Sequence, residues 1–441
     1  MRIVCFVLLF AAAQSGAAVL DVSPAQRSAL MQGAVGSRVT VADVPDGRGH
    51  ATTLVFRRIG VYAPGAKLVA HDGNAERVLP RSTRIEWIGY DTTGSTRAQL
   101  GFDPGFRNVV GTGSSPAGAF VIHASSDGAG LVVLPAEDAL PPGVHPQVVP
   151  GDDAVAGVAP VPERPVLAGA AQPAGTLHVA DVAVDVDHEL LVKRFGGVGA
   201  SNLDAAGAWI ADLFAAMNVM YERDLAVTLR QGTTIFRTGA TPYVIAADGA
   251  TNTDLNAFGT YWQAHHDAVQ RDFVMLLSGR MTSELSASGI AWINAYCRKP
   301  NTGGSYSVNK VFTSASASVG LSARIVGHEL GHNFGAAHTH CTNATSGVYP
   351  ASGNTIDQCV SGASMSGGAC YSGATSCPSN GPGAPNGTIM SYCNTIGCGS
   401  DHQNVLQFHP AQIAALSSLI AANTPSCLSL DTDLIFRDGF D

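Results

Sequence analysis

The sequence predicts an α+β domain, with an upper subdomain of the α/β type, over residues 176–428. A smaller β-rich domain over residues 19–140 precedes it. In the longer segment, apolar runs typical of strands alternate with stretches in which apolar residues recur at helical spacing. In the shorter segment, strand-like runs are separated by clusters of Gly, Pro and Asp. Residues 141–175 are dense in Pro, Ala, Val and Gly without a period, which is typical of an extended linker.

The N-terminus has the pattern of a signal peptide. Arg2 precedes the apolar run 3–13, which is too short to span a bilayer, and small residues follow up to Ala18. We therefore expect residues 1–18 to be removed and the mature protein to be secreted. No later segment approaches the roughly twenty uninterrupted apolar residues of a membrane helix, so we expect no stable membrane association.

The overall charge and composition narrow the range of partners. The net charge is −9, from 25 Lys and Arg against 34 Asp and Glu, and no run is rich in Lys or Arg. This excludes nucleic acid and anionic membranes as natural partners. Charged residues make up only 13%, and 50 Gly and 23 Pro indicate much uncharged surface loop, which suits a secreted protein. We expect a monomer.

Cysteine usage agrees with export. Cys5 lies in the signal peptide, and the other eight of the nine cysteines all lie in the C-terminal third. An even number in an exported chain predicts up to four disulfides, but eight cysteines allow 105 connectivities and spacing alone does not select one. A second zinc site built from thiolates is the alternative, and an oxidising compartment disfavours it. The eight are Cys297, Cys341, Cys359, Cys370, Cys377, Cys393, Cys398 and Cys427.

The predicted elements follow from these patterns in chain order. In the β-rich domain, strands are expected at residues 52–56, 84–89 and 118–123. In the α+β domain, Asp204 is expected to cap the first long helix, whose apolar residues form a core stripe. The other expected elements are strands at 176–188, 225–229, 233–236, 272–279 and 289–297, and helices at 255–269, 318–334 and 410–422.

One short stretch carries the chemistry of the predicted 318–334 helix. His328 and His332 are four residues apart, so both imidazoles lie on one helix face and can share a metal ion. Glu329 lies beside the first histidine, where its carboxylate can reach a metal-bound water. Gly335 permits a positive φ, so the chain can reverse and bring His338 back as the third ligand. Three imidazoles and one open position indicate a catalytic zinc.

This spacing matches the long metzincin signature, and the chain resembles a metzincin zinc metallopeptidase. Further along, residues 387–392 look like the Met-turn of that clan, in which Met390 would form a polarizable floor beneath the imidazoles. An ordinary core methionine is the alternative. Within the clan the closest similarity is to the adamalysin, or reprolysin, group, over roughly residues 176–427. It rests on Asp187 and His188, on the 272–279 and 289–297 segments, and on the zinc motif.

The resemblance implies further features. Residues 289–292 would lie at the edge strand that aligns an extended peptide substrate by strand addition. It also implies that Cys297 pairs with Cys427, which would tie the helix at 410–422 to the upper subdomain. Two features depart from the adamalysin pattern. Thr339 stands where those proteins carry Asp after the third histidine, and Tyr392 after Met390 is the arrangement of astacins and serralysins.

Latency is a separate question. The β-rich domain is a candidate propeptide and the chain a candidate zymogen. Residues 19–296 contain no cysteine, so a thiol switch on the metal is excluded. A carboxylate such as Asp152 is the alternative inhibitory ligand. Residues 429–441 form a C-terminal tail that resembles a tag on exported bacterial proteins.

The predicted function is zinc-dependent hydrolysis of peptide bonds in protein substrates. Zinc on the three histidines would lower the pKa of its bound water to about 7, with Glu329 as general base. Tyr392 would donate a hydrogen bond to the tetrahedral oxyanion, a contact worth roughly 3 kcal/mol in other enzymes. A calcium ion is compatible with the sequence but not indicated by it. Two alternative hypotheses are a secreted binding protein with an inactive zinc site and a zinc hydrolase of non-peptide substrates.

Overall fold

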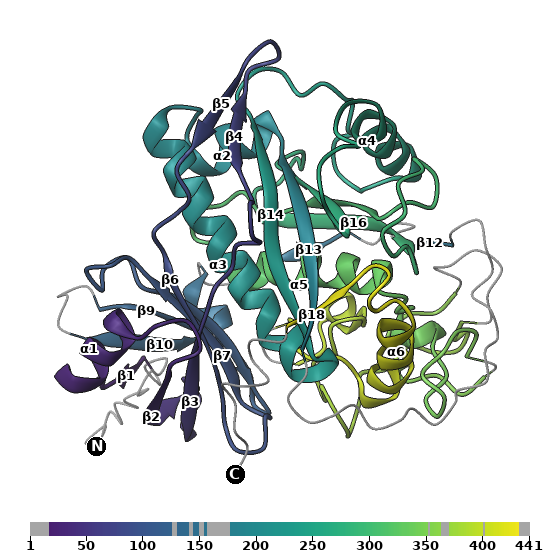
Figure 1. Cartoon of the computed structure of the whole chain (residues 1–441). Coiled ribbons are helices and arrows are strands. Elements are labelled where there is room, and N and C mark those ends of the chain that lie inside the picture. The colour runs from purple at the N-terminus through teal and green to yellow at the C-terminus, as the bar shows by residue number, and fades with distance from the viewer. Residues whose placement is uncertain are drawn as a thin grey trace, which may run out of the picture.

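The computed structural model describes residues 17–125, 130–140, 144–149, 154–156, 177–351, 353–362, 370–399 and 402–431. Two β-sheets dominate it, with two long helices between them (Figure 1). The first sheet belongs to the N-terminal part of the chain, and the second carries most of the remaining strands.

The first sheet is 8-stranded and antiparallel throughout, in the order β1-β10-β9-β8-β7-β6-β3-β2. Its inner face packs a core that includes Phe56, Trp87 and Phe120, and the short helix α1 (Pro24–Gln32) covers part of it. This confirms the three strands predicted in this region. The strands are β1 (Ala18–Leu20), β2 (Arg38–Pro45), β3 (Ala51–Ile59), β6 (Ile85–Tyr90), β7 (Arg97–Phe102), β8 (Val110–Ser115), β9 (Gly118–Ala124) and β10 (Leu131–Pro135), followed by the 3-10 turn η1 (Ala136–Ala139).

The second sheet is 10-stranded, and its main path runs β11-β16-β17-β15-β13-β14-β4-β5. Its centre is parallel, and β16 is antiparallel to β17 at one edge. The strands are β4 (Leu68–His71), β5 (Glu76–Leu79), β11 (Gln147–Val148), β12 (Ala154–Ala156), β13 (Leu177–Val186), β14 (Val227–Arg237), β15 (Phe273–Ser278), β16 (Ser286–Ile293), β17 (Tyr306–Lys310) and β18 (Ser429–Asp431).

Helices cover both faces of this second sheet. Helices α3 (Ala200–Leu225) and α5 (Val319–Asn333) pack against each other on the face toward the first sheet, and α4 (Asn252–His265) packs on the opposite face. By length and composition α3 would suit a membrane span, but 83% of its apolar window is buried, as in the core helix of a globular protein. The remaining elements are α2 (His188–Phe195), η2 (Thr339–Cys341), η3 (Cys393–Ile396) and α6 (Pro410–Ala422).

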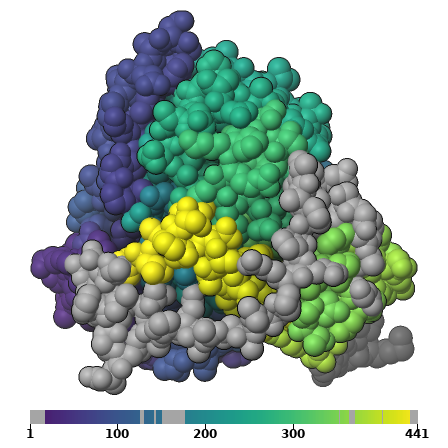
Figure 2. All heavy atoms as spheres, turned by 45° about the vertical axis from the view of Figure 1, so that its right-hand side comes forward, coloured from purple at the N-terminus to yellow at the C-terminus, as the bar shows by residue number. Residues whose placement is uncertain are grey.

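A hairpin from the N-terminal region belongs to the second sheet. β4 pairs in parallel with β14, and β5 extends the sheet by one more strand. Figure 2 shows this purple-blue hairpin standing against the teal and green part of the chain. Leu68, Ala70 and Leu79 join the main core beside α3. The 19–140 segment therefore supplies strands to both sheets.

Buried ion pairs also join the first sheet to α3. Arg84 donates to Asp212 at 2.5 Å, and Arg97 lies 3.0 Å from Asp224. Both arginines are on strands or loops of the N-terminal region, and both carboxylates lie on α3. Removing one partner of such a pair would leave a buried charge, so the two parts of the chain are energetically coupled.

Two segments within residues 141–175 are strands. β11 and β12 both run parallel to β16, in register with Ser286–Ala287 and Ala291–Ile293 respectively. The interpretation of this range as an extended linker is therefore wrong for these residues, because a low-complexity sequence can pair its backbone with an exposed sheet edge without any side-chain pattern. Asp152 and the Pro-rich stretch 157–175 lie outside the described residues.

Several predicted boundaries in the longer domain are corrected. The first long helix begins at Ala200 with Gly199 as its N-cap, so Asp204 lies within the helix and is not its cap. The strands predicted at 225–229 and 233–236 form one strand, β14, because backbone pairing with β13 continues past a bulge near Gly232. The helix α2, strand β17 and strand β18 were not predicted, since each is short and lacks a clear period.

Candidate active site

The helix α5 supplies the first half of the site. Its N-cap is Ser318 and all of its residues are buried, because it lies between the second sheet and α3. The Tyr221 hydroxyl of α3 donates to the Gly327 carbonyl at 2.8 Å. Burial raises the pKa of Tyr221 well above its usual range, so the hydroxyl keeps the proton that it donates. This bond fixes the helix one residue before His328.

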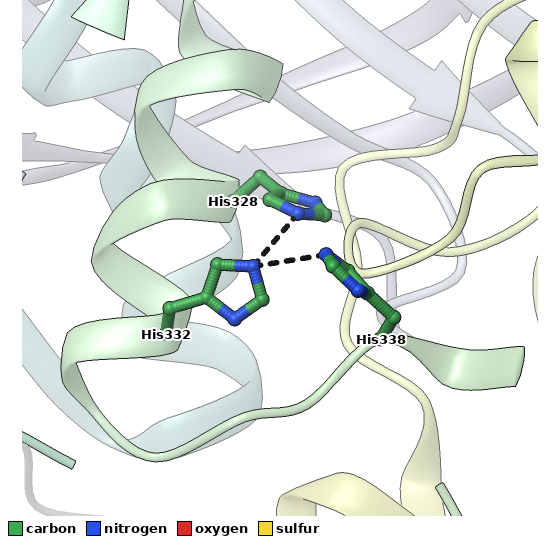
Figure 3. Close-up of side chains that lie close together, drawn as sticks. All are labelled: His328, His332 and His338. Atoms are coloured by element: carbon green, nitrogen blue, oxygen red, sulfur yellow. Dashed lines mark hydrogen bonds between the residues drawn. The ribbon is translucent and has the colours of Figure 1, made fainter. Parts of the chain in front are cut away.

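Three imidazoles converge at the C-terminal end of α5. Nε2 of His332 lies 3.1 Å from Nε2 of His328 and 3.1 Å from Nε2 of His338. Figure 3 shows the first two rings projecting from the helix and the third meeting them from the loop that follows. His328 is 7% exposed, and the other two are fully buried. The chain thus brings together the three histidines that the sequence predicted as ligands.

Backbone carbonyls hold two of the rings in a defined orientation. Nδ1 of His328 lies 2.8 Å from the Ile389 carbonyl oxygen, and Nδ1 of His332 lies 2.7 Å from that of Ala336. A carbonyl oxygen only accepts, so each Nδ1 carries the proton and each Nε2 presents a lone pair. Metal-binding histidines are typically oriented by such partners.

The donor set fits a metal ion. Tetrahedral coordination at the usual zinc–nitrogen distance places two ligand nitrogens about 3.3 Å apart, close to the observed separations of 3.1 Å. Without a cation, neutral imidazoles in these tautomers would point their lone pairs at one another in a buried space. All three ligand nitrogens lie within 4.8 Å of one another. His328, His332 and His338 are therefore the residues that would hold it.

The turn after the helix delivers the third histidine. Gly335 has φ +104°, in the region that favours glycine, as the sequence predicted. The next residues place His338 at the start of η2, and Thr339 then donates from its backbone N–H to the Met390 carbonyl at 3.0 Å. The Thr339 hydroxyl donates to the same oxygen at 3.2 Å. The residue that departs from the adamalysin pattern thus ties the third histidine to the segment around Met390.

Met390 lies under the helix end. It is fully buried, and its sulfur is so close to α5 that a β-carbon on Gly331 would be 2.6 Å from it. The neighbouring Ser391 hydroxyl donates to Asp357 at 2.8 Å, and the Cys359–Cys393 disulfide links the same two segments. This turn is therefore braced on both sides and keeps the Ile389 carbonyl against His328.

Glu329 lies against β16 of the second sheet, which the resemblance implied to be an edge strand but which β11 and β12 extend. It is 2% exposed. A β-carbon on Gly289 would be 2.1 Å from Glu329 Oε1 and 2.5 Å from Cγ and Cδ, so only glycine leaves room for this carboxylate. Gly289 lies in β16, the strand that the resemblance assigned to substrate alignment. The carboxylate is thus in direct contact with β16.

Tyr392 lies beside the triad. Its ring centroid is 4.6 Å from that of His338 and 6.0 Å from that of His328, and it is 4% exposed. The ring of His340 stacks on His338 at 5.5 Å and on Tyr392 at 5.6 Å. The tyrosine predicted from the sequence is therefore part of the same cluster.

Comparison with known proteins agrees with this geometry. Residues 176–408, more than half of the chain, match the reprolysin-type profile of metallo-peptidase family M12. The chain belongs to metallo-peptidase family M12. Membership implies a metzincin-type zinc metalloendopeptidase that acts on protein or peptide substrates.

Two further comparisons add little to the M12 assignment. The crystal structure of metalloproteinase-II from Bacteroides fragilis matches with a TM-score of 0.39 and 12% identity, over 74% of this chain and 88% of that one. A similarity this low supports no functional inference. No curated protein sequence matches the chain.

Cysteines of this M12 peptidase form four disulfides near the site. Cys297 pairs with Cys427, as the resemblance implied, and the bond joins the end of β16 to the segment after α6. The others are Cys341–Cys370, Cys359–Cys393 and Cys377–Cys398. A thiolate zinc site is thereby ruled out for these cysteines.

Some site residues of the M12 peptidase were not found from the sequence. The carbonyls of Ile389 and Ala336 leave no sequence signal because every residue has one. Asp357, under the Met390 turn, lies in a Gly- and Ser-rich insertion without a motif.

Proposed function

We propose that this M12 peptidase hydrolyses peptide bonds with one zinc ion on His328, His332 and His338. The observation that supports it best is the convergence of three buried Nε2 atoms, two of them with Nδ1 held by backbone carbonyls. On this proposal α5 is the zinc helix, and the turn at Met390 is the Met-turn beneath it.

Bound zinc supplies Lewis-acid activation of the attacking water and of the scissile carbonyl. Glu329 accepts the proton of the attacking water as general base and transfers it to the leaving amine. Its burial between α5 and β16 holds the carboxylate in place and limits access of bulk water. The Tyr392 hydroxyl donates a hydrogen bond to the carbonyl oxygen as that atom gains negative charge. The edge of β16 that β11 and β12 occupy in this structure aligns the substrate backbone.

The decisive experiment is casein digestion by the zinc-loaded chain beside its Glu329→Ala variant, each before and after limited elastase digestion stopped by a serine-protease inhibitor, with and without a chelator. The zinc content of both proteins is measured in parallel. We expect chelator-sensitive cleavage by the wild type, and near-complete loss in the variant at unchanged zinc content. Cleavage that persists in Glu329→Ala would refute the assigned base. A chain that binds no zinc would refute the metal site itself.

We further propose that the chain is a zymogen in which residues 144–149 obstruct the substrate edge. The N–H groups of Gln147 and Val149 donate to the carbonyls of Leu285 and Ala287, each at 2.9 Å. These carbonyls are on or next to β16, where a substrate backbone would bind. Val148 packs on an apolar cluster that includes Leu321 and Ile325 of α5. A substrate strand therefore has to displace this segment.

Activation would require cleavage beyond this segment. Residues 157–175 are rich in Ala and Val, which elastase accepts, and a serine-protease inhibitor stops elastase without affecting a metal-dependent enzyme. Limited elastase digestion followed by that inhibitor should raise caseinolysis of the wild type and leave Glu329→Ala inactive. N-terminal sequencing locates the cut. Equal activity before and after cleavage would refute latency.

The remaining proposals concern the whole chain. We propose that residues 1–18 are a signal peptide, residues 19–140 a propeptide domain and residues 176–428 the catalytic domain. The predicted tail, 429–441, is not separate over its first residues, because Ser429–Asp431 form β18 and pair with β13. Four disulfides in the C-terminal third support folding in an oxidising compartment, and so support secretion.

A further inference from the structure

The helix α3 is the surface on which the N-terminal region rests. It runs between the two sheets, and strands β6 and β7 of the first sheet pack against it (Figure 1). Ile59, Leu68 and Leu79 of the N-terminal region belong to the same buried cluster as the apolar face of α3. An interface that resembles a divided hydrophobic core is typical of permanent complexes. Separation of the two parts would expose this core to water.

Three buried ion pairs cross the same interface. Each arginine comes from the N-terminal region and each carboxylate from α3. The side chains of the three carboxylates are between 4% and 6% exposed. A buried charge left without its partner is strongly destabilising, so the pairs oppose any partial separation of the two parts. The pairs are Arg57–Glu222, Arg84–Asp212 and Arg97–Asp224.

Backbone hydrogen bonds join the N-terminal region to β14. The N–H of Gln231 donates to the Val61 carbonyl at 2.6 Å, and the N–H of Ala63 donates to the Gln231 carbonyl at 2.9 Å. Strand β4 continues this contact in parallel register to the last residue of β14. By contrast, β11 and β12 on the other side of the sheet are strands of two and three residues. A cut beyond them can therefore free the segment 144–149 without freeing the N-terminal domain.

Arg97 extends the interface toward the metal site. Its Nη1 donates to both oxygens of Asp224 at 3.0 Å and to the Leu406 carbonyl at 3.1 Å. Asp224 in turn accepts a hydrogen bond from the N–H of Phe408 at 2.8 Å. The ion pair thus fixes the backbone on both sides of Gln407. Arg97 is 5% exposed, so water competes little for these bonds.

The segment that Arg97 holds is paired with the turn at Met390. The N–H of Ile389 donates to the Gln407 carbonyl at 2.8 Å. The Ile389 carbonyl accepts from Nδ1 of His328, also at 2.8 Å. Hydrogen bonds therefore connect Arg97 with His328 through two backbone segments. Removing the partners that orient a ligating imidazole typically lowers metal affinity or activity by about 10- to 100-fold.

We infer that the N-terminal region stays bound to the catalytic domain after activation, as a subunit of the active peptidase, and that Arg97 is its positioning residue for the metal site. The inference rests on the proposed peptidase function and on the proposed cut within 157–175. Activation removes the obstruction at β16 and leaves α3, β14 and the segment 405–408 covered. The active form is a complex of two chains, and the N-terminal chain is required for it.

The first test measures whether the two chains separate. The wild-type chain is cut with elastase, the elastase is inhibited, and the product is run on size-exclusion chromatography in native buffer and in concentrated urea. We expect both chains and the caseinolytic activity in one native peak, and two separate chains in urea. An active C-terminal chain that elutes without the N-terminal chain, or that stays active after the N-terminal chain is degraded, would overturn the inference. Co-elution without activity would count against the proposed function and not against the retained interface.

The second test uses the uncut chain. Its zinc dissociation constant is measured by competition with a chromophoric chelator, and the absorption spectrum after cobalt substitution reports the ligand geometry. Arg97→Met combined with Asp224→Asn removes the bond to the Leu406 carbonyl without leaving an unpaired charge. Arg84→Met combined with Asp212→Asn is the matched control, because it removes an ion pair of the same interface about 18 Å away along α3.

We expect the zinc dissociation constant to rise at least about tenfold in the Arg97 double variant, with a changed cobalt spectrum, and to stay within about twofold of wild type in the control. Arg97→Lys keeps a cation beside Asp224 and should recover most of the affinity. A purely structural role would lower the melting temperatures of both double variants and leave their zinc affinities equal, which would overturn the inference. A wild-type chain that binds no zinc would instead refute the proposed metal site.

Discussion

Gly289 provides a sharp test of how Glu329, the proposed general base, is positioned. In Gly289→Ala the new β-carbon would lie 2.1 Å from Glu329 Oε1, whereas ordinary van der Waals contact begins at 3.4 Å. The carboxylate oxygen must therefore retreat by about 1.3 Å. Because a misplacement of about 1 Å can cost 100-fold in rate, we expect kcat/KM to fall by roughly two orders of magnitude.

The same substitution should leave the fold and the metal site intact. The obstructing atoms belong to the end of a flexible side chain, so the backbone need not move, and the ligands His328 and His332 are not touched. The assay is hydrolysis of a fluorogenic peptide by the activated chain, with zinc content and melting temperature measured on the same samples. The matched control is Gly207→Ala on α3, where the new β-carbon would be at ordinary contact, 3.5 Å from Leu68. Full activity in Gly289→Ala would refute the proposal that Glu329 acts as general base from its position against β16.

Three further predictions concern activation and stability. Val148→Asp should raise caseinolysis of the uncleaved chain at least about tenfold, because a carboxylate is costly in the apolar cluster that holds the segment; Gln147→Asp, at an exposed position, should not. Arg97→Ala should destabilise the chain by about 3 kcal/mol in urea unfolding, since it leaves Asp224 buried without its cation. Burial raises the pKa of Asp272 from 3.8 to about 7, so the folded state binds this proton more tightly than the unfolded state. The protonated carboxyl therefore contributes to the free energy of unfolding in full below about pH 4, and this contribution is lost as the pH rises to about 7. In Asp272→Asn the free energy of unfolding should no longer fall over this pH range for this reason.

The outcomes that would contradict these predictions are equally specific. An unchanged activity of Val148→Asp would mean that the segment does not control access to β16. A change under about 0.5 kcal/mol in Arg97→Ala would mean that the two parts of the chain are not coupled through this pair. For Asp272, thermal unfolding between pH 4 and 8 should show the variant and the wild type converging at the acid end. Parallel curves would show that the carboxyl is ionised in the folded protein.

The local part of the site could be read from the sequence because its geometry is set by helix periodicity. Residues four apart on α5 share a face whatever the rest of the chain does, so the prediction that the His328 and His332 rings lie together holds, with their Nε2 atoms 3.1 Å apart. Gly335 was identified because a positive φ favours glycine in any fold. The strand and helix alternation of the longer domain was also predictable, since it depends on short-range apolar patterns.

The rest depended on pairings between distant segments, which leave no local signal. Nothing in residues 68–79 indicates that they extend the second sheet beside β14, since a hairpin sequence does not specify which sheet edge it joins. The same holds for residues 147–148 on β16 and for three of the four disulfides. The orientation of His328 by the Ile389 carbonyl, and the room that Gly289 leaves for Glu329, come from segments brought together only by the fold. The sequence therefore determined which atoms are candidate metal ligands, and the tertiary structure decided how those atoms are oriented and which segments pair with β16.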